Sequence, residues 1–400
     1  MKILILTQYF WPENFQINDL ALELKKQGHS VEVLTGKPNY PSGKFFSGYS
    51  FLRPFSETFH SIPVYRVPLL PRFTAKGWQL ILNYMSFVFF ACFRVLYLSQ
   101  KKYDLVFVFE PSPIFQALPA ILLKKLYGTH LVLWVLDIWP ESLEATGAMK
   151  NPRALKIVGR VVNFIYKNCD LILASSETFI PKIRARTDRP IRHFPNWADS
   201  IFEQQVQSPN KNSEEDFIVT FAGNIGKAQS FSTILEAAHK LKDHVHIKWH
   251  VYGDGREKAW AQKKAKELGL EESVKFFGMK PLSEMPKIFS ASDALLITLK
   301  KDPVFELTVP AKLQTYLACG KPIVASLDGE GADIIRKARA GYVAETENDS
   351  ALAKNVLALK TLSASDRAIL GENGRRFYLE NYSRKMLMNR AQKLFEEVIQ

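Results

Sequence analysis

The most informative stretch of the sequence for chemistry runs from Val304 to Val324 and places a carboxylate, a lysine and an amide around one predicted helix. Glu306 precedes this helix, Lys312 lies in its first turn, and Gln314 follows one turn in. A carboxylate and an amide so placed can hydrogen-bond sugar hydroxyl groups, while the free N–H groups of the helix start hold a diphosphate.

The boundaries of that helix follow from its flanking residues. It is expected over Ala311–Ala318, with Thr308 as its cap, Pro310 in its first turn and Gly320 at its end. Another apolar run follows at once, so the helix is predicted to connect two strands.

Two glycine-containing loops provide further anion-binding candidates. Gly223-Asn224-Ile225-Gly226-Lys227 follows a predicted strand, and its glycines let the backbone approach a phosphate while Lys227 supplies charge. An ordinary tight turn explains this loop equally well. Gly253-Asp254-Gly255-Arg256 follows the next strand, but Lys258 stands where a dinucleotide fingerprint has its third glycine, which argues against a nicotinamide enzyme.

Short apolar runs alternate with longer amphipathic ones on both sides of a polar stretch, Gln204–Asp216, which is predicted to be a linker. This alternation is typical of βα units and predicts an α/β fold with two doubly wound domains. Their expected bounds are 1–200 and 217–382, followed by a helical segment over 383–400 that can pack back across the first domain. The expected strands are Ile3–Thr7, Val31–Thr35, Val64–Val67, Leu105–Phe109, Leu131–Leu136, Leu171–Ala174, Ile191–Phe194, Ile218–Ala222, Ile247–Tyr252, Val274–Phe277, Ala294–Leu299 and Pro322–Ala325.

Length and composition fit two globular domains. The chain has 400 residues, of which 47% are hydrophobic and 23% charged, which excludes a disordered protein. Its three cysteines, Cys92, Cys169 and Cys319, each stand alone in an apolar or helical context without a second thiol at metal-ligand spacing, which fits a reducing compartment and no disulfide framework. The N-terminal apolar run is short and is predicted to be a buried strand rather than a signal peptide.

The charge is unevenly distributed. The net charge is +13, and residues 1–200 account for +10 of it, with 24 basic and 14 acidic residues. Within this half, Leu80–Leu98 is nineteen residues long and contains a single charge, Arg94. Arg94 and Asn83 argue against a membrane span. Two interpretations remain open: a helix lying in the plane of an anionic membrane, or a buried helix with basic flanks.

The motifs together resemble those of the retaining GT-B glycosyltransferases of family four. The stretch from Glu306 to Lys321 resembles the family's donor-binding motif, in which two glutamates have seven residues between them, with Gln314 at the second position. Thr308–Pro322 is similar to bacterial surface-polysaccharide enzymes, especially the N-acetyl-L-fucosamine transferase branch of O-antigen synthesis. Phe276–Pro281, Trp134–Ser142 and Pro195–Asp199 resemble other blocks of the family, and the likeness covers nearly the whole chain.

This resemblance implies a GT-B fold, two facing Rossmann-like domains with a deep cleft between them, and a role for particular residues. It implies that Glu306, Asp137 and Glu141 are the catalytic carboxylates and that Asn14, Phe15 and Trp139 contact the acceptor. The residues that it assigns to the donor are Gly223, Asn224, Gly226, Lys227, Gly253, Gly255, Met279, Thr308, Val309, Pro310, Lys312 and Gln314.

The implied reaction moves an amino sugar from a UDP-sugar to an undecaprenyl-diphosphate-linked saccharide with retention of configuration. The expected location is cytoplasmic, at the anionic cytoplasmic face of a bacterial inner membrane. The sequence contains no Asp-any-Asp triplet, so a metal-independent reaction without cofactors is predicted. His244, His246 and His250 share one side of a strand but span too great a length to meet one zinc ion.

The chain also departs from the family pattern. Members often have arginine and lysine at the positions of Asn224 and Gln229, so Lys227, Lys312 or helix N–H groups must hold the phosphates here. Asp137 is equally well explained as a structural cap before Pro140. Two rival functions are a sugar-nucleotide 2-epimerase with the same two-domain layout, and a nucleic-acid-binding protein, which only the pI of 9.4 suggests.

Overall fold

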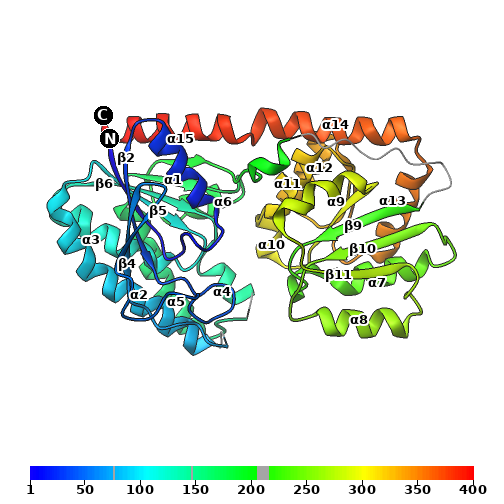
Figure 1. Cartoon of the computed structure of the whole chain (residues 1–400), viewed down its shortest axis with the longest axis horizontal. Coiled ribbons are helices and arrows are strands. Elements are labelled where there is room, and N and C mark those ends of the chain that lie inside the picture. The colour runs from blue at the N-terminus through cyan, green and yellow to red at the C-terminus, as the bar shows by residue number, and fades with distance from the viewer. Residues whose placement is uncertain (75–76, 146, 205–215) are drawn as a thin grey trace. The chain divides into compact units, whose positions relative to one another are not determined.

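The computed structural model describes residues 1–74, 77–145, 147–204 and 216–400, which form two compact units (Figure 1). The first unit comprises Met1–Pro195 together with Leu387–Gln400, and the second comprises Asn196–Met386. Most of the predicted linker, residues 205–215, lies outside the described residues.

The first unit is built on an eight-stranded sheet with the order β3-β4-β2-β1-β5-β6-β7-β8, in which only the β3–β4 pair is antiparallel. Its central strands β1, β5 and β6 are buried along nearly their whole length because helices cover both faces of a doubly wound sheet. The strands are β1 (Lys2–Leu6), β2 (Ser30–Gly36), β3 (Ser56–Phe59), β4 (Ile62–Val67), β5 (Leu105–Glu110), β6 (His130–Val135), β7 (Leu171–Ala174) and β8 (Ile191–His193).

The helices around this sheet bury one apolar side each. In α1, Ile17, Leu20, Ala21 and Leu24 are buried, and Gly28 follows the helix in the left-handed conformation that the sequence suggests. The helices are α1 (Gln16–Lys26), α2 (Gly77–Leu98), α3 (Leu118–Tyr127), α4 (Glu141–Ala145), α5 (Pro152–Asn168) and α6 (Phe179–Arg184).

The last helix, α15 (Arg384–Ile399), brings the end of the chain back to the first unit. Its residue Phe395 is buried and packs on Phe107 of β5, with 5.1 Å between the ring centroids. Both chain termini therefore lie in this unit, as Figure 1 shows.

The second unit repeats the design with six parallel strands in the order β11-β10-β9-β12-β13-β14. Its strands are β9 (Phe217–Ala222), β10 (Ile247–Tyr252), β11 (Val274–Gly278), β12 (Ala294–Thr298), β13 (Ile323–Ser326) and β14 (Gly341–Ala344). Its helices are α7 (Phe231–Lys240), α8 (Lys258–Glu267), α9 (Met285–Ala291), α10 (Pro303–Leu307), α11 (Ala311–Cys319), α12 (Glu330–Ala338), α13 (Asp349–Thr361) and α14 (Ala364–Asn381). The predicted pair of doubly wound α/β units is confirmed.

Strand order locates the ligand-binding edge of each sheet. In the first unit the chain winds outward from β1 through β2 and β4, and then outward on the other side from β5 to β8. In the second unit the direction changes between β9 and β12. Doubly wound sheets bind ligands beyond the carboxyl ends of the strands at such a switch point, so the loops after β1, β5, β9 and β12 are the places to search.

Helix α2 differs from the other helices of its unit because much of its apolar surface is exposed. The segment Gly77–Lys101 has a mean hydropathy of 1.7 in its most apolar window, and only 28% of that window is buried. A stripe of large apolar side chains follows the helical repeat on its exposed side: Trp78, Ile81, Leu82, Met85, Phe89 and Phe93. Asn83 and Phe87, on the opposite side, are fully buried. The helix thus has one side in the fold and one apolar side in contact with solvent.

Candidate active site

In the second unit, the loops after β9, β10 and β11 pack backbone against backbone beside the switch point. Gly253 has φ +131°, and a Cβ atom there would overlap the carbonyl oxygen of Gly223. A Cβ atom at Gly255 would likewise overlap the carbonyl oxygen of Ile225, whose own N–H donates to Asp254 O at 2.8 Å. The glycines at 253 and 255 are therefore required by close approach of two loops.

The rim of these loops is open to solvent. Gly223, Asn224 and Lys227 are exposed, and Gly226 is half-buried beside the side chain of Asn224. A short helical turn, Lys227–Gln229, follows, and the N–H of Lys300 after β12 donates to Ala228 O at 2.8 Å. The loop after β9 is thus fastened to the strand across the switch point, where a bound anion is expected.

Lys312 enters this loop from α11. Its Nζ lies 3.0 Å from Gln229 Oε1 and 3.9 Å from the centroid of the Phe221 ring, and a Cβ atom at Gly223 would be 3.3 Å from Nζ. The ammonium group is enclosed by protein and has no carboxylate partner in the described chain, so desolvation lowers its pKa to about 7. An incoming anion would supply the missing counter-charge at the glycine loop.

The segment before α11 differs from the sequence prediction. Pro303–Leu307 forms a short helix, α10, capped by Asp302, and Glu306 lies inside it. Thr308 is not the cap of α11: its hydroxyl donates back to Val304 O at 2.8 Å and so closes α10, while α11 begins after Pro310 without a side-chain cap. Thr308 therefore hydrogen-bonds within α10, the short helix before Pro310, and not within α11. The spacing of residues in the sequence does not show this.

Glu306 is half-buried, and its carboxylate has no hydrogen bond or ion pair with any residue that the structure describes. Its backbone is fixed because Gly329, at φ +70°, packs so closely that a Cβ atom there would overlap the carbonyl oxygen of Glu306. The carboxylate is therefore held on a rigid backbone and is available to a ligand.

Gln314 is 1% exposed, in contrast to Glu306. In the orientation that satisfies its surroundings, its amide nitrogen donates to Pro310 O at 3.2 Å and to Ala311 O at 3.1 Å. A carboxylate in this place would face two carbonyl oxygens without a proton to share. This geometry explains why an amide occupies the position.

The remaining predicted donor residues lie at the edges of this site. Val309 is half-buried against the apolar core of the second unit, and Met279 after β11 is 76% exposed. Beside Met279, the rings of Tyr252 and Phe277 stack with an interplanar angle of 12° and 4.8 Å between centroids. Phe277 is 42% exposed and offers a flat apolar surface to a planar group such as a base.

In the first unit, the switch point lies between Gln8, which follows β1, and Glu110, which ends β5. The N–H of Gln8 donates to Gln116 Oε1 at 2.7 Å, and its amide donates to Asn83 of α2 at 2.6 Å. Glu110 is fully buried and neither carboxylate oxygen has a hydrogen bond of ordinary geometry. Burial, and then the nearby charge of Asp137, raise the pKa of Glu110 well above its usual range.

Asp137 lies after β6, next to Glu110. Burial raises the pKa of Asp137, while hydrogen bonds from Ser142, Trp139 and Ser112 oppose that shift. The indole N–H of Trp139 donates to Asp137 Oδ2 at 3.0 Å, and Trp139 is only 3% exposed. Trp139, expected at the acceptor, thus orients Asp137 and has little surface for a ligand.

The third predicted catalytic carboxylate, Glu141, begins α4 and is bound by Arg186, whose Nη2 lies 2.7 Å from Glu141 Oε1. Asn14 is exposed, and Phe15 stacks on Tyr9 at 5.2 Å. Asn14 and Phe15 therefore remain accessible to an acceptor, whereas Glu141 is held in an ion pair.

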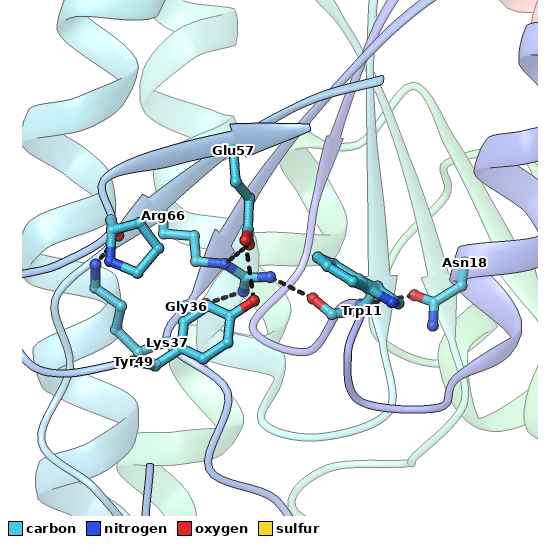
Figure 2. Close-up of polar contacts among 8 residues, drawn as sticks. Trp11, Asn18, Gly36, Lys37, Tyr49, Glu57 and Arg66 are labelled. Carbon is cyan, nitrogen blue, oxygen red and sulfur yellow. Dashed lines mark hydrogen bonds and ion pairs between the residues drawn. The ribbon is translucent and has the colours of Figure 1, made fainter. Parts of the chain in front are cut away.

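Arg66, on β4, fixes the loops at the carboxyl edge of this sheet (Figure 2). Its guanidinium bonds the Glu57 carboxylate, the carbonyl oxygen of Gly36 at the end of β2, and the carbonyl oxygen of Trp11 after β1. Arg66 is 1% exposed and its charge is neutralised by Glu57. Its buried ion pair and its bonds to two carbonyl oxygens give Arg66 a structural role.

The sequence analysis missed Glu13, which supports the loop after β2. Glu13 Oε1 accepts hydrogen bonds from the N–H groups of Asn39 at 2.9 Å and Tyr40 at 2.7 Å. Burial raises the pKa of Glu13 to about 7 against the opposing effect of these bonds. Glu13 lies in the loop after the buried strand β1, and Glu110 ends the buried strand β5. The sequence signal that the two share is a carboxylate at the end of a buried apolar run or in the loop after it.

Comparison with known proteins matches each unit to a glycosyltransferase domain family. The model described as "Glycosyl transferases group 1" matches residues 202–377, and the model "Glycosyl transferase 4-like domain" matches residues 14–197. The chain is a glycosyltransferase whose C-terminal part matches the group 1 family. The loops after β9 and β12, Glu306 and Lys312 all lie within the part that the group 1 model matches.

Three similar proteins illustrate these matches. The transferase is 26% identical over 337 residues to the putative colanic acid biosynthesis glycosyl transferase WcaI of Escherichia coli, covering 80% of this chain and 82% of WcaI. It is 28% identical over 281 residues to the probable glycosyltransferase WbjE of Pseudomonas aeruginosa, covering 66% and 69%. HepE from Anabaena, solved in complex with UDP-glucose, superposes with a TM-score of 0.70 at 15% identity, covering 99% and 100%, which confirms the GT-B fold.

Among the described ranges, no three histidine, cysteine or carboxylate side chains lie together as a metal site. Of the three histidines, only His250 lies on β10, since that strand begins at Ile247, and Nδ1 of His246 lies 3.4 Å from Asp216 Oδ1.

Proposed function

We propose that this transferase moves a sugar, N-acetyl-L-fucosamine or a related amino sugar, from a UDP-sugar to a polyprenyl-diphosphate-linked saccharide in bacterial O-antigen or capsule synthesis. The main observation in support of a nucleotide-sugar donor is Lys312, whose ammonium group is enclosed beside a glycine loop and has no counter-charge among the described residues. The name of WcaI, a putative colanic acid biosynthesis glycosyl transferase, supports the setting in surface-polysaccharide synthesis, and the UDP-glucose complex of HepE supports the donor class.

The transfer needs two things from the chain: stabilisation of the departing diphosphate and placement of the sugar. Lys312 and the uncapped first N–H groups of α11 supply positive charge for the diphosphate. Glu306, whose carboxylate is free, accepts hydrogen bonds from sugar hydroxyl groups. The reaction is proposed to be metal-independent and to retain the anomeric configuration, with the departing phosphate taking the acceptor proton and Asp137 assisting.

A thermal-shift screen with UDP, GDP and their sugar conjugates tests the donor, because a ligand that binds only the folded protein raises its melting temperature. UDP-sugars should give the larger shift. Glu306→Ala should keep the fold and the UDP shift but abolish transfer in a radiolabelled-sugar assay, and full activity would exclude Glu306 from the site. Addition of EDTA should leave the rate unchanged.

We further propose that the transferase works at the cytoplasmic face of the inner membrane, with the exposed stripe of α2 in the lipid interface. Large apolar side chains on one side of a helix, in a unit with excess positive charge, fit an anionic bilayer surface. Fractionation should place the protein with inner membranes, released by salt or mild detergent. Recovery in the cytosol alone would contradict this proposal.

A further inference from the structure

Arg72 lies at the carboxyl edge of the first unit's sheet, in the segment that follows β4. Its guanidinium carbon lies 4.9 Å from the ring centroid of Tyr9, 5.2 Å from that of Tyr40 and 5.6 Å from that of Tyr84. Tyr9 follows β1, Tyr40 follows β2, and Tyr84 belongs to α2. Three elements distant in sequence therefore enclose one cation at the ligand-binding edge.

The N–H groups along the edge of the Arg72 guanidinium have no hydrogen-bond acceptor among the described residues. In the described part of the chain, Arg72 makes no ion pair and no side-chain hydrogen bond, and its Nε is buried without an acceptor. The hydroxyl group of Tyr9 is also buried without a partner. Arg66 differs from Arg72 in this respect, because its guanidinium donates hydrogen bonds to a carboxylate and to two carbonyl oxygens.

The backbone of this site is rigid. Asn39 Oδ1 accepts a hydrogen bond from the N–H of Arg72 at 3.3 Å, and Glu13 holds the N–H groups of Asn39 and Tyr40. Phe73 N–H donates to Gly43 O at 2.9 Å, so the loop after β2 packs directly against the segment of Arg72. The guanidinium is thus positioned before any ligand arrives, which lowers the entropy that binding must overcome.

We propose that Arg72, with Tyr9, Tyr40 and Tyr84 around it, binds the diphosphate of the lipid-linked acceptor. Stacked tyrosines cover the faces of the guanidinium and leave its N–H edge, which matches the oxygens of a phosphate group in a bidentate manner. The hydroxyl of Tyr9 provides a further donor. This inference rests on the proposed function, which supplies the acceptor.

The neighbourhood of Arg72 selects a lipid over a free phosphate. Tyr84 lies on α2, and two hydrogen bonds attach the segment of Arg72 to the same helix: Ser86 Oγ accepts from Leu70 N–H at 2.9 Å, and Asn83 donates to Leu70 O. Met85, next to Tyr84, belongs to the exposed apolar stripe of α2. A charged headgroup at Arg72 would therefore leave its hydrocarbon chain beside an apolar surface.

Vesicle co-sedimentation tests this site without requiring transfer. The full-length protein is mixed with phosphatidylcholine vesicles, either plain or containing farnesyl diphosphate or farnesol. Farnesyl diphosphate should increase binding of the wild type at least tenfold over farnesol, as expected for a charge-assisted bidentate contact. Arg72→Met, which keeps an apolar stem, should lose that increment, and Arg72→Lys should restore part of it.

Arg94 provides the matched control, because its guanidinium also stacks on two tyrosines, 5.2 Å from Tyr65 and 5.1 Å from Tyr97, but comes from α2 itself. Arg94→Met should keep the farnesyl diphosphate increment. Equal loss in both variants, or no increment for the wild type, would overturn the proposal. An unchanged UDP thermal shift in Arg72→Met shows that the fold is intact.

A competition arm distinguishes the source of the phosphate. Inorganic diphosphate at concentrations equal to that of farnesyl diphosphate should displace little protein, since it lacks the chain that contacts α2. Complete displacement would show a site for free phosphate and overturn the lipid assignment. If the protein binds farnesyl diphosphate through Arg72 but transfers no sugar, the proposed function fails while the Arg72 site stands.

Discussion

We expect Lys312 to make nucleotide binding depend on pH. Its ammonium group is desolvated, has a pKa of about 7 in the free protein, and faces a loop that is expected to hold a diphosphate. Only the protonated form attracts the diphosphate, and the negative charge of the bound diphosphate raises the pKa of Lys312 in the complex. Affinity is therefore fully present below pH 7 and falls as the pH rises above it, until the pKa in the complex is reached.

The size of the effect follows from the free-state pKa. With a pKa near 7, the protonated fraction decreases from about one half at pH 7 to about 3% at pH 8.5, so UDP affinity should fall about 16-fold, or about 1.6 kcal/mol. The phosphate groups of UDP do not contribute in this range, because their last ionisation has a pKa of about 6.

Titration calorimetry with UDP between pH 7 and pH 8.5 measures this change. Lys312→Met should bind UDP weakly at every pH, and Lys312→Arg should bind it with the same affinity across the range, because arginine stays charged. Uridine, which lacks the diphosphate, should show no pH dependence. A dissociation constant for UDP that does not change with pH, or a change that persists in Lys312→Met, would refute the reasoning.

Three further substitutions have defined outcomes. Gly253→Ala should abolish UDP binding and lower the melting temperature, because its Cβ atom would overlap Gly223 O. The control is Gly269→Ala, where φ is also positive but the space for a Cβ atom is open, so this variant should lose only about 1 kcal/mol of stability. Gln314→Glu should cost about 1–3 kcal/mol in denaturant unfolding because the carboxylate would face the carbonyl oxygens of Pro310 and Ala311; unchanged stability would show that the amide orientation is wrong. The pKa of Glu110 is raised in the folded state, so the carboxyl ionises more readily in the unfolded chain, and the free energy of unfolding falls as the pH rises above about 4.5. Glutamine does not ionise, so Glu110→Gln should stabilise the protein more at pH 8 than at pH 5 in thermal unfolding.

The sequence predicted the observed strands except β3 and β14. Apolar runs such as Leu105–Phe109 and Ile247–Tyr252 match the observed strands within a residue. Ser56–Phe59 and Gly341–Ala344 were missed because neither is a buried apolar run: in each of these edge strands only the last residue is buried. The short helix α10 was missed for a related reason, since five residues show no helical repeat.

The candidate site was predictable only where its residues are close in sequence. The glycine loops and the segment around α11 were found because each lies directly after a strand or at a helix start. The tyrosines around Arg72 come from three separate elements, and only the strand order brings them together. No local pattern marks Tyr84 as the neighbour of Tyr9, so this cluster required the fold.

Carboxylate partners set Arg66 and Arg186 apart from Lys312 and Arg72. Arg66 is paired with Glu57 and Arg186 with Glu141, and each pair joins segments of the first unit, so these cations stabilise the fold. Lys312 and Arg72 are also enclosed, yet neither has a carboxylate partner in the described parts of the chain, although an enclosed charge without a counter-charge is unfavourable. Folding does not require such an arrangement, but a ligand that brings negative charge makes it favourable. A glycosyltransferase with a nucleotide donor and a lipid diphosphate acceptor would bring two such groups, one for each of these cations.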